Sequence, residues 1–289
     1  MNPKMFNLLT GFIVARHGVY VNRQLGKPKP WTNDLILRQY RFCNVYRELD
    51  KVTKWIARNW RTPNQDDPHL WFAMLVARYI NEPDTLKELG YPVPWNLKLW
   101  LRAVEYRKSI GQNVFNAAYI IPPTAGSRTG GTTVGGPKHE ALGRFFTYFW
   151  EHRNEMKPAK DQALADYADK LCTVPGMGRF FAGQIIADLK YVPILKKSPD
   201  WWTFAVSGPG SRRGLNRVLG RPVNQTWKEI EWFGELTSLR GAVSTVIKNV
   251  AAMDAIHAQD MQNCLCEFDK YMRVKLGEGR PKQKYPGER

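Results

Sequence analysis

The densest group of side chains that could bind a phosphate follows the turn Gly208-Pro209-Gly210. Arginine donates two parallel hydrogen bonds to a phosphate, so several arginines in one short segment suit a strongly anionic group. Ser211 can cap the helix that this turn opens, which would present backbone amides beside the guanidinium groups. The alternative is a basic surface without a specific ligand. The predicted phosphate-binding residues of this segment are Arg212, Arg213, Asn216 and Arg217, with Arg221 close behind.

Carboxylates that could act as a general base are the second chemical signal. Asp200 precedes Trp201 and Trp202. An aromatic setting makes a carboxylate a stronger base, so Asp200 is the first choice, with a helix-capping role as its alternative. Asp188 and Glu48 are the second choices for the catalytic base.

Charged residues of both signs are mixed at two further places. Arg47 stands beside Glu48 and Asp50, and Lys270 follows Glu267 in a similar mixture. Arg47 or Lys270 could hold the carboxylate of a small substrate. A solvated charged face is the usual meaning of such a run, and it is the alternative here.

The stretch from Leu171 to Leu189 predicts two short helices joined by a tight turn. Apolar residues repeat at helical spacing on either side of it. Pro175 fixes one φ angle, while Gly176 and Gly178 permit positive φ and leave backbone N–H groups uncovered. A helix N-terminus with bare amides binds phosphate, although an ordinary turn between two core helices would look similar. The predicted DNA contact consists of Pro175, Gly176, Met177, Gly178 and Arg179.

Composition narrows the class of partner. The chain has 289 residues and a formal charge of +17, from 43 Lys and Arg against 26 Asp and Glu. This excess of positive charge indicates that the protein binds a polyanionic partner, and nucleic acid is the first candidate. A hydrophobic content of 43% excludes a disordered chain. Because no apolar run is long enough to span a membrane and no signal-peptide pattern is present, we expect a cytoplasmic protein with no membrane partner.

Cysteine and histidine spacing argues against a metal centre. The four cysteines, at 43, 172, 264 and 266, are too scattered for a disulfide scaffold or a CxxC zinc site. The five histidines form no HxxxH or HExxH pattern. We therefore assign no metal ligand from the sequence.

Two segments predict loops with basic side chains. Residues 122–138 are rich in glycine and do not form a Walker-type motif; they suit either a lid that brings Arg128 and Lys138 to phosphate or a plain surface loop. The tail over 277–289 is basic and predicted to be disordered by itself, with Arg280 and Lys282 available to phosphate.

Helical spacing of apolar residues predicts an all-α fold. Expected helices cover residues 41–60, 68–80, 95–110, 227–252 and 254–276, together with a helix from Asp34 and the helices around the two glycine turns. We expect a single domain of two helical lobes around a cleft, at about 1–135 and 136–276, followed by the tail.

Five motifs together carry a family resemblance. The chain resembles the alpha-glutamyl/putrescinyl thymine pyrophosphorylase family, which is related to the helical domain of some phage 5-hydroxymethyluracil DNA kinases. The resemblance implies a helix-hairpin-helix fold similar to DNA glycosylases, used in phage DNA hypermodification. The motifs are NVYRELDKVT, FNAAYII, VPGMGRFFAGQIIADLKY, GPGSRRGLNR and LCEFDKY.

The same resemblance implies an activity. In that pathway a hydroxymethyluracil in DNA is phosphorylated or pyrophosphorylated, and an enzyme of this family then replaces the phosphate with an amine. We therefore expect a monomeric transferase that flips its base out of double-stranded DNA and takes an amino acid or polyamine as donor. A divalent cation could accompany the pyrophosphate, and a monovalent cation could sit at the hairpin.

Two other functions remain open at this point. In a monofunctional glycosylase that excises a modified pyrimidine, Asp200 would stand near the position of the family's catalytic aspartate. The lysine nucleophile of bifunctional glycosylases is replaced by Phe180, which disfavours a lyase. A noncatalytic DNA-binding adaptor is the third reading.

Overall fold

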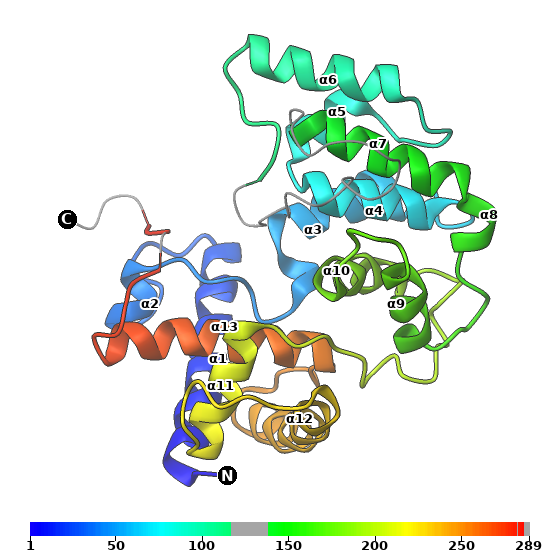
Figure 1. The fold of residues 1–289 in the computed structure, drawn as a ribbon. Helices are drawn as coiled ribbons and strands as arrows, with labels where there is room; N and C mark the ends of the chain where they lie inside the picture. The colour runs from blue at the N-terminus through cyan, green and yellow to red at the C-terminus, as the bar shows by residue number, and fades with distance from the viewer. Residues whose placement is uncertain (117–137, 282, 286–289) are drawn as a thin grey trace. The chain divides into compact units, whose positions relative to one another are not determined.

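The computed structural model describes residues 1–116, 138–281 and 283–285. Within these residues every regular element is a helix, and no β-strand is present (Figure 1). The one extended pairing there is an isolated antiparallel bridge between Tyr40 and Lys284. The prediction of an all-α chain is confirmed.

The chain divides into two compact units. The terminal unit comprises residues 1–50 and 202–289, and the central unit is continuous over 51–201. This division differs from the expected lobes, because the first fifty residues are grouped with the C-terminal helices. The expected boundary near residue 135 falls outside the described residues.

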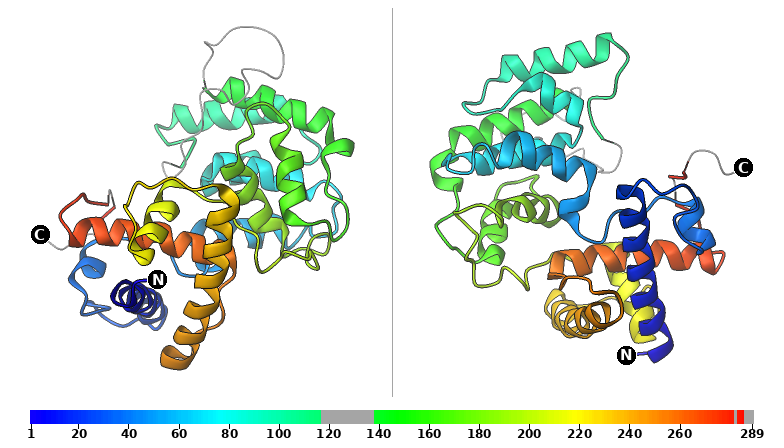
Figure 2. Two further views of the ribbon diagram at one scale, coloured as in Figure 1. Left: turned by 60° about the horizontal axis from the view of Figure 1, so that its bottom comes forward. Right: turned by 180° about the vertical axis from the view of Figure 1, so that it is seen from behind.

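The terminal unit is organised around its last helix. Its elements are α1 (Pro3–Gln24), α2 (Leu35–Gln39), the 3-10 turn η1 (Arg47–Leu49), α11 (Pro209–Leu219), α12 (Glu229–Ala251) and α13 (Ala258–Lys275). The helices α1, α2, α11 and α12 all contact α13, and the views in Figure 2 show them around it. Asn2 and Asp34 cap α1 and α2 through side-chain oxygens that accept backbone N–H groups, which starts both helices where they begin.

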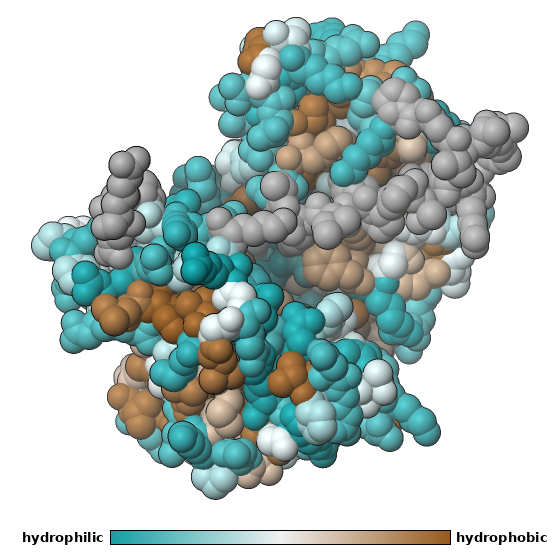
Figure 3. Space-filling view, turned by 60° about the vertical axis from the view of Figure 1, so that its left-hand side comes forward, coloured by the Kyte–Doolittle hydropathy of each residue, from teal (hydrophilic) through white to brown (hydrophobic). Residues whose placement is uncertain are grey.

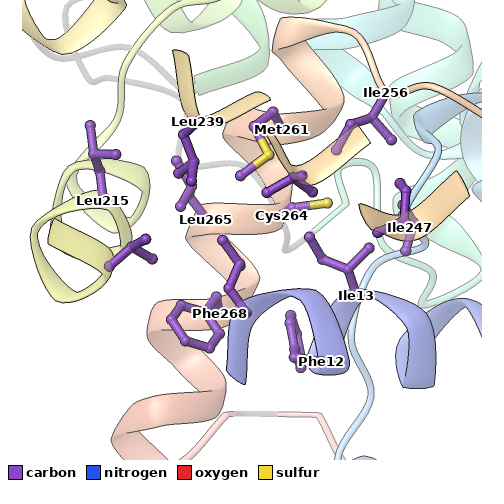
Figure 4. Close-up of a cluster of buried hydrophobic side chains, with 14 of the residues drawn as sticks. Phe12, Ile13, Leu215, Leu239, Ile247, Ile256, Met261, Cys264, Leu265 and Phe268 are labelled. Carbon is purple, nitrogen blue, oxygen red and sulfur yellow. The ribbon is translucent and has the colours of Figure 1, made fainter. Parts of the chain in front are cut away.

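Apolar side chains from α1, α11 and α13 meet in the core of the terminal unit (Figure 4). Phe12 and Ile13 of α1, Leu215 of α11, and Met261 and Leu265 of α13 are each at most 4% exposed. Burial of one such side chain stabilises a fold by about 1.5–3 kcal/mol. This core therefore fixes the faces that α1 and α13 turn toward each other.

The central unit packs its helices around α4. Its elements are α3 (Lys51–Ile56), the π-helical turn η2 (Ala57–Arg61), α4 (Leu70–Ile80), α5 (Pro83–Leu89), α6 (Leu97–Ser109), α7 (Lys138–Glu151), α8 (Arg153–Met156), α9 (Leu164–Cys172) and α10 (Arg179–Leu189). Every residue of α4 is buried, as expected for a helix whose residues other than Arg78 are all uncharged and mostly apolar. Tyr79 of α4 stacks on Phe181 of α10 with ring centres 4.0 Å apart.

The helix predicted over residues 41–60 is wrong in its first half. Residues 41–46 are not helical, and α3 begins only at Lys51. Asn44 explains the difference: its backbone N–H donates to Oδ1 of Asp50, and its side-chain amide donates to the carbonyl of Leu49, both at 3.0 Å. Such local side-chain bonds compete with helical hydrogen bonding.

The tail is also more ordered than predicted over its described part. The backbone N–H of Arg41 donates to the carbonyl of Gln283, and that of Tyr285 donates to the carbonyl of Gln39, each at 3.1 Å. These bonds hold residues 283–285 against the segment that follows α2. The prediction of a tail without its own order is therefore wrong for these residues.

On the face drawn in Figure 3, outside the residues drawn in grey, hydrophilic residues predominate and apolar residues form separate patches. Among the helices that the structure describes, none has both the length and the apolar character to cross a bilayer.

Candidate functional site

Two segments far apart in the sequence meet in the terminal unit, where the chain after α2 lies beside α13. The backbone N–H of Arg47 donates to Oδ1 of Asp260 at 3.0 Å, and that of Cys43 donates to Oε2 of Glu267 at 3.4 Å. Asp260 and Glu267 are only 3% and 2% exposed. The structure therefore brings Arg47 and Lys270, each predicted as a possible ligand of a substrate carboxylate, to adjoining elements. We call the following residues the charge cluster: Arg16, Arg47, Asp50, Asp260, Glu267 and Lys270.

Arg16 supplies buried positive charge from α1 and is 4% exposed. Its Nη2 donates to Sγ of Cys264 at 2.9 Å, and the guanidinium lies 5.2 Å from the ring centre of Phe12. In the part of the chain that the structure describes, Nε and Nη1 of Arg16 have no hydrogen-bond partner. Unmatched buried donors on a charged group reduce stability unless a water molecule or a ligand accepts from them. An anionic ligand would supply the missing acceptors.

Lys270 is held as a cation by its neighbour on α13. Its Nζ donates to Oε1 of Glu267 at 2.6 Å. Burial alone would lower the pKa of Lys270, but the charge and hydrogen bond of Glu267 outweigh burial and raise that pKa above its usual value. A lysine of this kind binds anions and is not suited to act as a base.

Asp50 has the properties of a proton acceptor. Burial raises the pKa of this carboxyl above its usual value, although the Asn44 hydrogen bond and the charges of Arg47 and Arg16 oppose the shift. A half-buried carboxylate with a raised pKa beside cations is a common arrangement in catalytic sites. The sequence alone placed Asp50 only within a charged face.

A small pocket adjoins the charge cluster between α1 and the segment after α2. Its volume is about 20 Å³, which is room for roughly one water molecule. The walls combine polar groups of Arg16, Asn44 and Tyr20 with the rings of Tyr40 and Tyr285. The pocket thus links the buried guanidinium of Arg16 to the described part of the tail.

The predicted arginine clamp on α11 is already ion-paired within the terminal unit. Arg213 and Arg217 share the buried carboxylate of Asp269, at 2.9 and 3.0 Å. Arg212 pairs with Glu229 at 2.5 Å. These pairs join α11 to α13 and α12 and so stabilise the terminal unit. Arg213 bonds Asp269 through Nε alone and its side chain is 31% exposed, so its contact with phosphate stays a prediction.

Asn216 shapes the loop after α11. It is fully buried, and its Nδ2 donates to the carbonyls of Val223 and Gln225 at 3.0 Å. Its Oδ1 accepts the indole N–H of Trp227 at 2.5 Å. The structure gives Asn216 this loop-fixing role in place of the predicted contact with phosphate, because a fully buried amide with these bonds does not reach a ligand.

Asp200, the first choice for a catalytic base, and Asp188, a second choice, both carry structural contacts in the central unit. Asp200 accepts the backbone N–H groups of Leu164 and Ala165, at 2.7 and 2.9 Å, and so caps α9. Asp188 is fully buried and accepts two hydrogen bonds from Arg78, each 2.5 Å long. Capping, the alternative given for Asp200, is what the structure contains. Asp188 is fully buried in its pair with Arg78, and its role as a base stays a prediction.

Glu48, the remaining candidate base, lies half-buried in η1 beside Arg47. This position is next to the charge cluster in the sequence, so Glu48 stays a predicted member of the site.

The predicted DNA-binding turn joins α9 to α10. Gly176 has φ of 93°, and a Cβ added to Gly178 would meet no atom within 4 Å. Met177 is 5% exposed and belongs to the core, so its side chain is withdrawn from the predicted contact. Arg179 is exposed and pairs with Asp169 at 2.6 Å. An open turn at a helix N-terminus remains, formed by Pro175, Gly176, Gly178 and Arg179.

The other predicted basic residues lie apart from the charge cluster in the sequence. Lys138 begins α7, with its ammonium 5.1 Å from the ring centre of Phe115. Arg280 is exposed after α13, while Lys282 and the Arg128 loop lie outside the described residues.

Arg16 and Asp260 are the site residues that sequence reasoning missed. A signal for Arg16 exists: it repeats at helical spacing with Phe12 and Val19, so an arginine falls on the buried face of α1. Asp260 had no such signal, because its contact with Arg47 spans most of the chain. Among the described residues, no group of three or more His, Cys, Asp or Glu side chains is arranged to hold a metal ion.

The fold and the charge cluster define an all-helical domain with a buried, mixed-charge site. Comparison with known proteins gives the family. The family described as "5-hmdU DNA kinase, helical domain" matches residues 3–280, and the chain belongs to it. The expected relation to phage 5-hydroxymethyluracil DNA kinases is thereby confirmed.

A curated relative is the 5-hmdU DNA kinase of Bacillus phage SP10, which is 24% identical over 281 residues. The alignment covers 90% of this chain and 43% of the relative, so the chain spans less than half of that protein's length. No solved structure matches the chain.

Proposed function

We propose that this chain is a DNA-modifying transferase of phage-type DNA hypermodification. It replaces the phosphate or pyrophosphate of a 5-(pyro)phosphomethyl-uracil base in DNA with an amine from an amino acid or polyamine. Family membership and the kinase relative support a modified pyrimidine in DNA as substrate. The observation that carries the proposal is the charge cluster, where Arg16 holds unmatched donors close to a raised-pKa carboxylate, Asp50.

The proposed reaction forms a C–N bond at the 5-methylene carbon. The amine nitrogen attacks this carbon, the C–O bond to the leaving group breaks, and the electron pair departs with phosphate or pyrophosphate. The amine loses one proton, which Asp50 accepts. Arg16, Arg47 and Lys270 stabilise the negative charge that develops on the leaving oxygen. A divalent cation could add to this stabilisation.

The proposed DNA contact is the turn between α9 and α10. The turn has the features of a helix-hairpin-helix, with a positive φ at Gly176 and an open Gly178 before an eleven-residue helix. In this proposal the protein grips the sugar–phosphate chain there, as DNA glycosylases do, and receives a base flipped out of the duplex. The formal charge of +17 supports binding to a polyanion.

The test is nucleoside mass spectrometry of three matched duplexes. They carry 5-hydroxymethyluracil, its phosphate ester or its pyrophosphate ester at one position, and each is incubated with the protein and a mixture of amino acids and polyamines. We expect an amine-substituted nucleoside and equimolar phosphate or pyrophosphate from an esterified duplex only. The unesterified duplex is the matched control. If the protein binds all three duplexes but leaves their nucleosides unchanged, the transferase proposal is wrong and the chain is a DNA-binding module.

Two variants test the residue assignment in the same assay. Asp50→Asn removes the proposed base and should abolish transfer, whereas Asp200→Asn changes a capping residue and should leave transfer per folded molecule unchanged. If the DNA instead acquires abasic sites, detected as alkali-labile strand breaks, the chain is a glycosylase and the transferase proposal is wrong.

A further inference from the structure

A basic face with aromatic rings lies at the described end of the tail. Two half-buried rings, Trp31 and Tyr285, meet edge to face with centres 5.4 Å apart. The Arg23 guanidinium lies 5.2 Å from the Trp31 ring centre and 5.8 Å from that of Tyr285. Lys29 stands 5.4 and 5.7 Å from the same two centres, and Arg41 stands 5.5 Å from Tyr285. We call these five residues the basic aromatic face.

The rings are held in place by the protein itself. The indole N–H of Trp31 donates to the carbonyl of Lys27 at 2.8 Å, and Asn22 donates to the carbonyl of Trp31 at 2.9 Å. Tyr285 is fixed by backbone pairing with Gln39 at 3.1 Å. A preformed surface loses little conformational entropy when a ligand binds.

Arg23 and Arg41 have little internal compensation of their charge. Arg23, Lys29 and Arg41 are all exposed, and within the described residues no ion pair joins Arg23 or Arg41 to a carboxylate. Neighbouring like charges repel each other, and an anionic partner would relieve that repulsion. By contrast, the arginines of α11 are all neutralised by carboxylates.

We propose that the basic aromatic face binds a strand of nucleic acid. Phosphates lie against Arg23 and Arg41, and a base contacts the exposed part of the Tyr285 ring. Cations that follow a backbone, interleaved with rings that stack on bases, are the chemistry of single-strand binding. An acidic protein would satisfy the cations but would not use the paired rings. This surface goes beyond the proposed transfer reaction, because none of its five residues is assigned to catalysis.

The experiment measures binding of the full chain to one labelled oligonucleotide, as a single strand and as a duplex, between about 50 and 200 mM salt. We expect Arg23→Ala and Arg41→Ala each to weaken single-strand binding and to reduce the slope of log K against log salt by about one unit. Tyr285→Ala should weaken binding about tenfold or more, and Tyr285→Phe should bind like the wild type. Lys248→Ala, an exposed basic residue of α12, is the matched control.

Several outcomes overturn the proposal. If Arg23→Ala and Arg41→Ala bind and respond to salt as Lys248→Ala does, the face is not a nucleic-acid surface. If Arg23→Ala or Arg41→Ala loses binding, keeps the salt slope of the wild type and melts at a lower temperature, that arginine has a structural role. Binding to vesicles with anionic lipid, but not to the oligonucleotide, would make the partner a membrane. Transfer activity is measured separately, with saturating DNA. If the protein binds the oligonucleotide but shows no transfer, the transferase proposal is overturned and the proposal for the basic aromatic face stands.

Discussion

Gly214 on α11 stands directly against the carbonyl oxygen of Leu265 on α13, so closely that an added Cβ would lie 2.1 Å from that oxygen. Gly210, one turn earlier, faces Cys266 in the same way, with an added Cβ 2.5 Å from Sγ. Glycine at both positions therefore lets two helix backbones touch. The motif GPGSRRGLNR owes its second and third glycines, Gly210 and Gly214, to this contact, which also brings Arg213 to Asp269.

Replacing Gly214 by alanine should destabilise the terminal unit. The methyl group can be accommodated only by moving α11 away from the α13 backbone, which costs about 3 kcal/mol or more. The melting temperature should fall by about 6–12 °C. Gly234→Ala in α12, where an added Cβ meets nothing, is the control and should stabilise by about 0.5–1 kcal/mol. Equal melting temperatures for both variants would contradict the close helix contact.

Asp188→Asn separates a structural role from a catalytic one. The variant leaves the guanidinium of Arg78 buried without its carboxylate, and the expected loss is about 3–5 kcal/mol. Denaturant unfolding measures this loss. Asp169→Asn, which breaks the exposed pair with Arg179, should cost at most about 1 kcal/mol. A stable Asp188→Asn protein without activity would restore Asp188 as the base.

Asp50→Asn should stabilise the protein at neutral pH while removing activity. The folded pKa of Asp50 lies above its unfolded value, so the folded state binds the proton more tightly. The contribution of this group to stability is therefore largest below the unfolded pKa and falls as pH rises through the folded pKa. Unfolding curves of both proteins should converge in acid and separate at neutral pH, with the variant more stable. Transfer should fall by about 10²–10⁴. A variant less stable at neutral pH would show that the carboxylate is structural.

Arg16→Met tests the unmatched guanidinium. Methionine fills similar space without buried charge, so stability should be unchanged or higher. Transfer should drop by about 10²–10³, because a charge that faces the leaving group is lost. Arg58→Met, at an exposed position of η2, should alter neither property. Unfolding of Arg16→Met, with its activity per folded molecule intact, would assign Arg16 to structure.

Local patterns predicted the helices well where the pattern was uninterrupted. The helices expected over 68–80 and 227–252 are α4, Leu70–Ile80, and α12, Glu229–Ala251. Apolar spacing reports such elements because neighbouring residues decide them. The helix prediction failed for the segment after α2, because Asn44 and Asp50 form a hydrogen bond with each other in place of helical hydrogen bonds.

The site was harder to predict because its contacts are long-range. Arg47 and Lys270 were recognised by their mixed-charge settings, but their meeting depends on α13 folding back onto the chain after α2. Asp188 looked available in sequence, yet its partner Arg78 lies 110 residues earlier. The spacing of residues around Asp188 and around Arg78 does not predict that the two side chains form an ion pair.

The discontinuous terminal unit sets an order of events during synthesis. The central unit is complete once residue 201 has left the ribosome, whereas α1 must keep Phe12 and Ile13 exposed until the last helix is made. Arg16 and Asp50 are made before the central unit, and Glu267 and Lys270 are made after it. The charge cluster can therefore assemble only after the whole central unit and α13 have been made, so a chain that stops before α13 lacks the cluster.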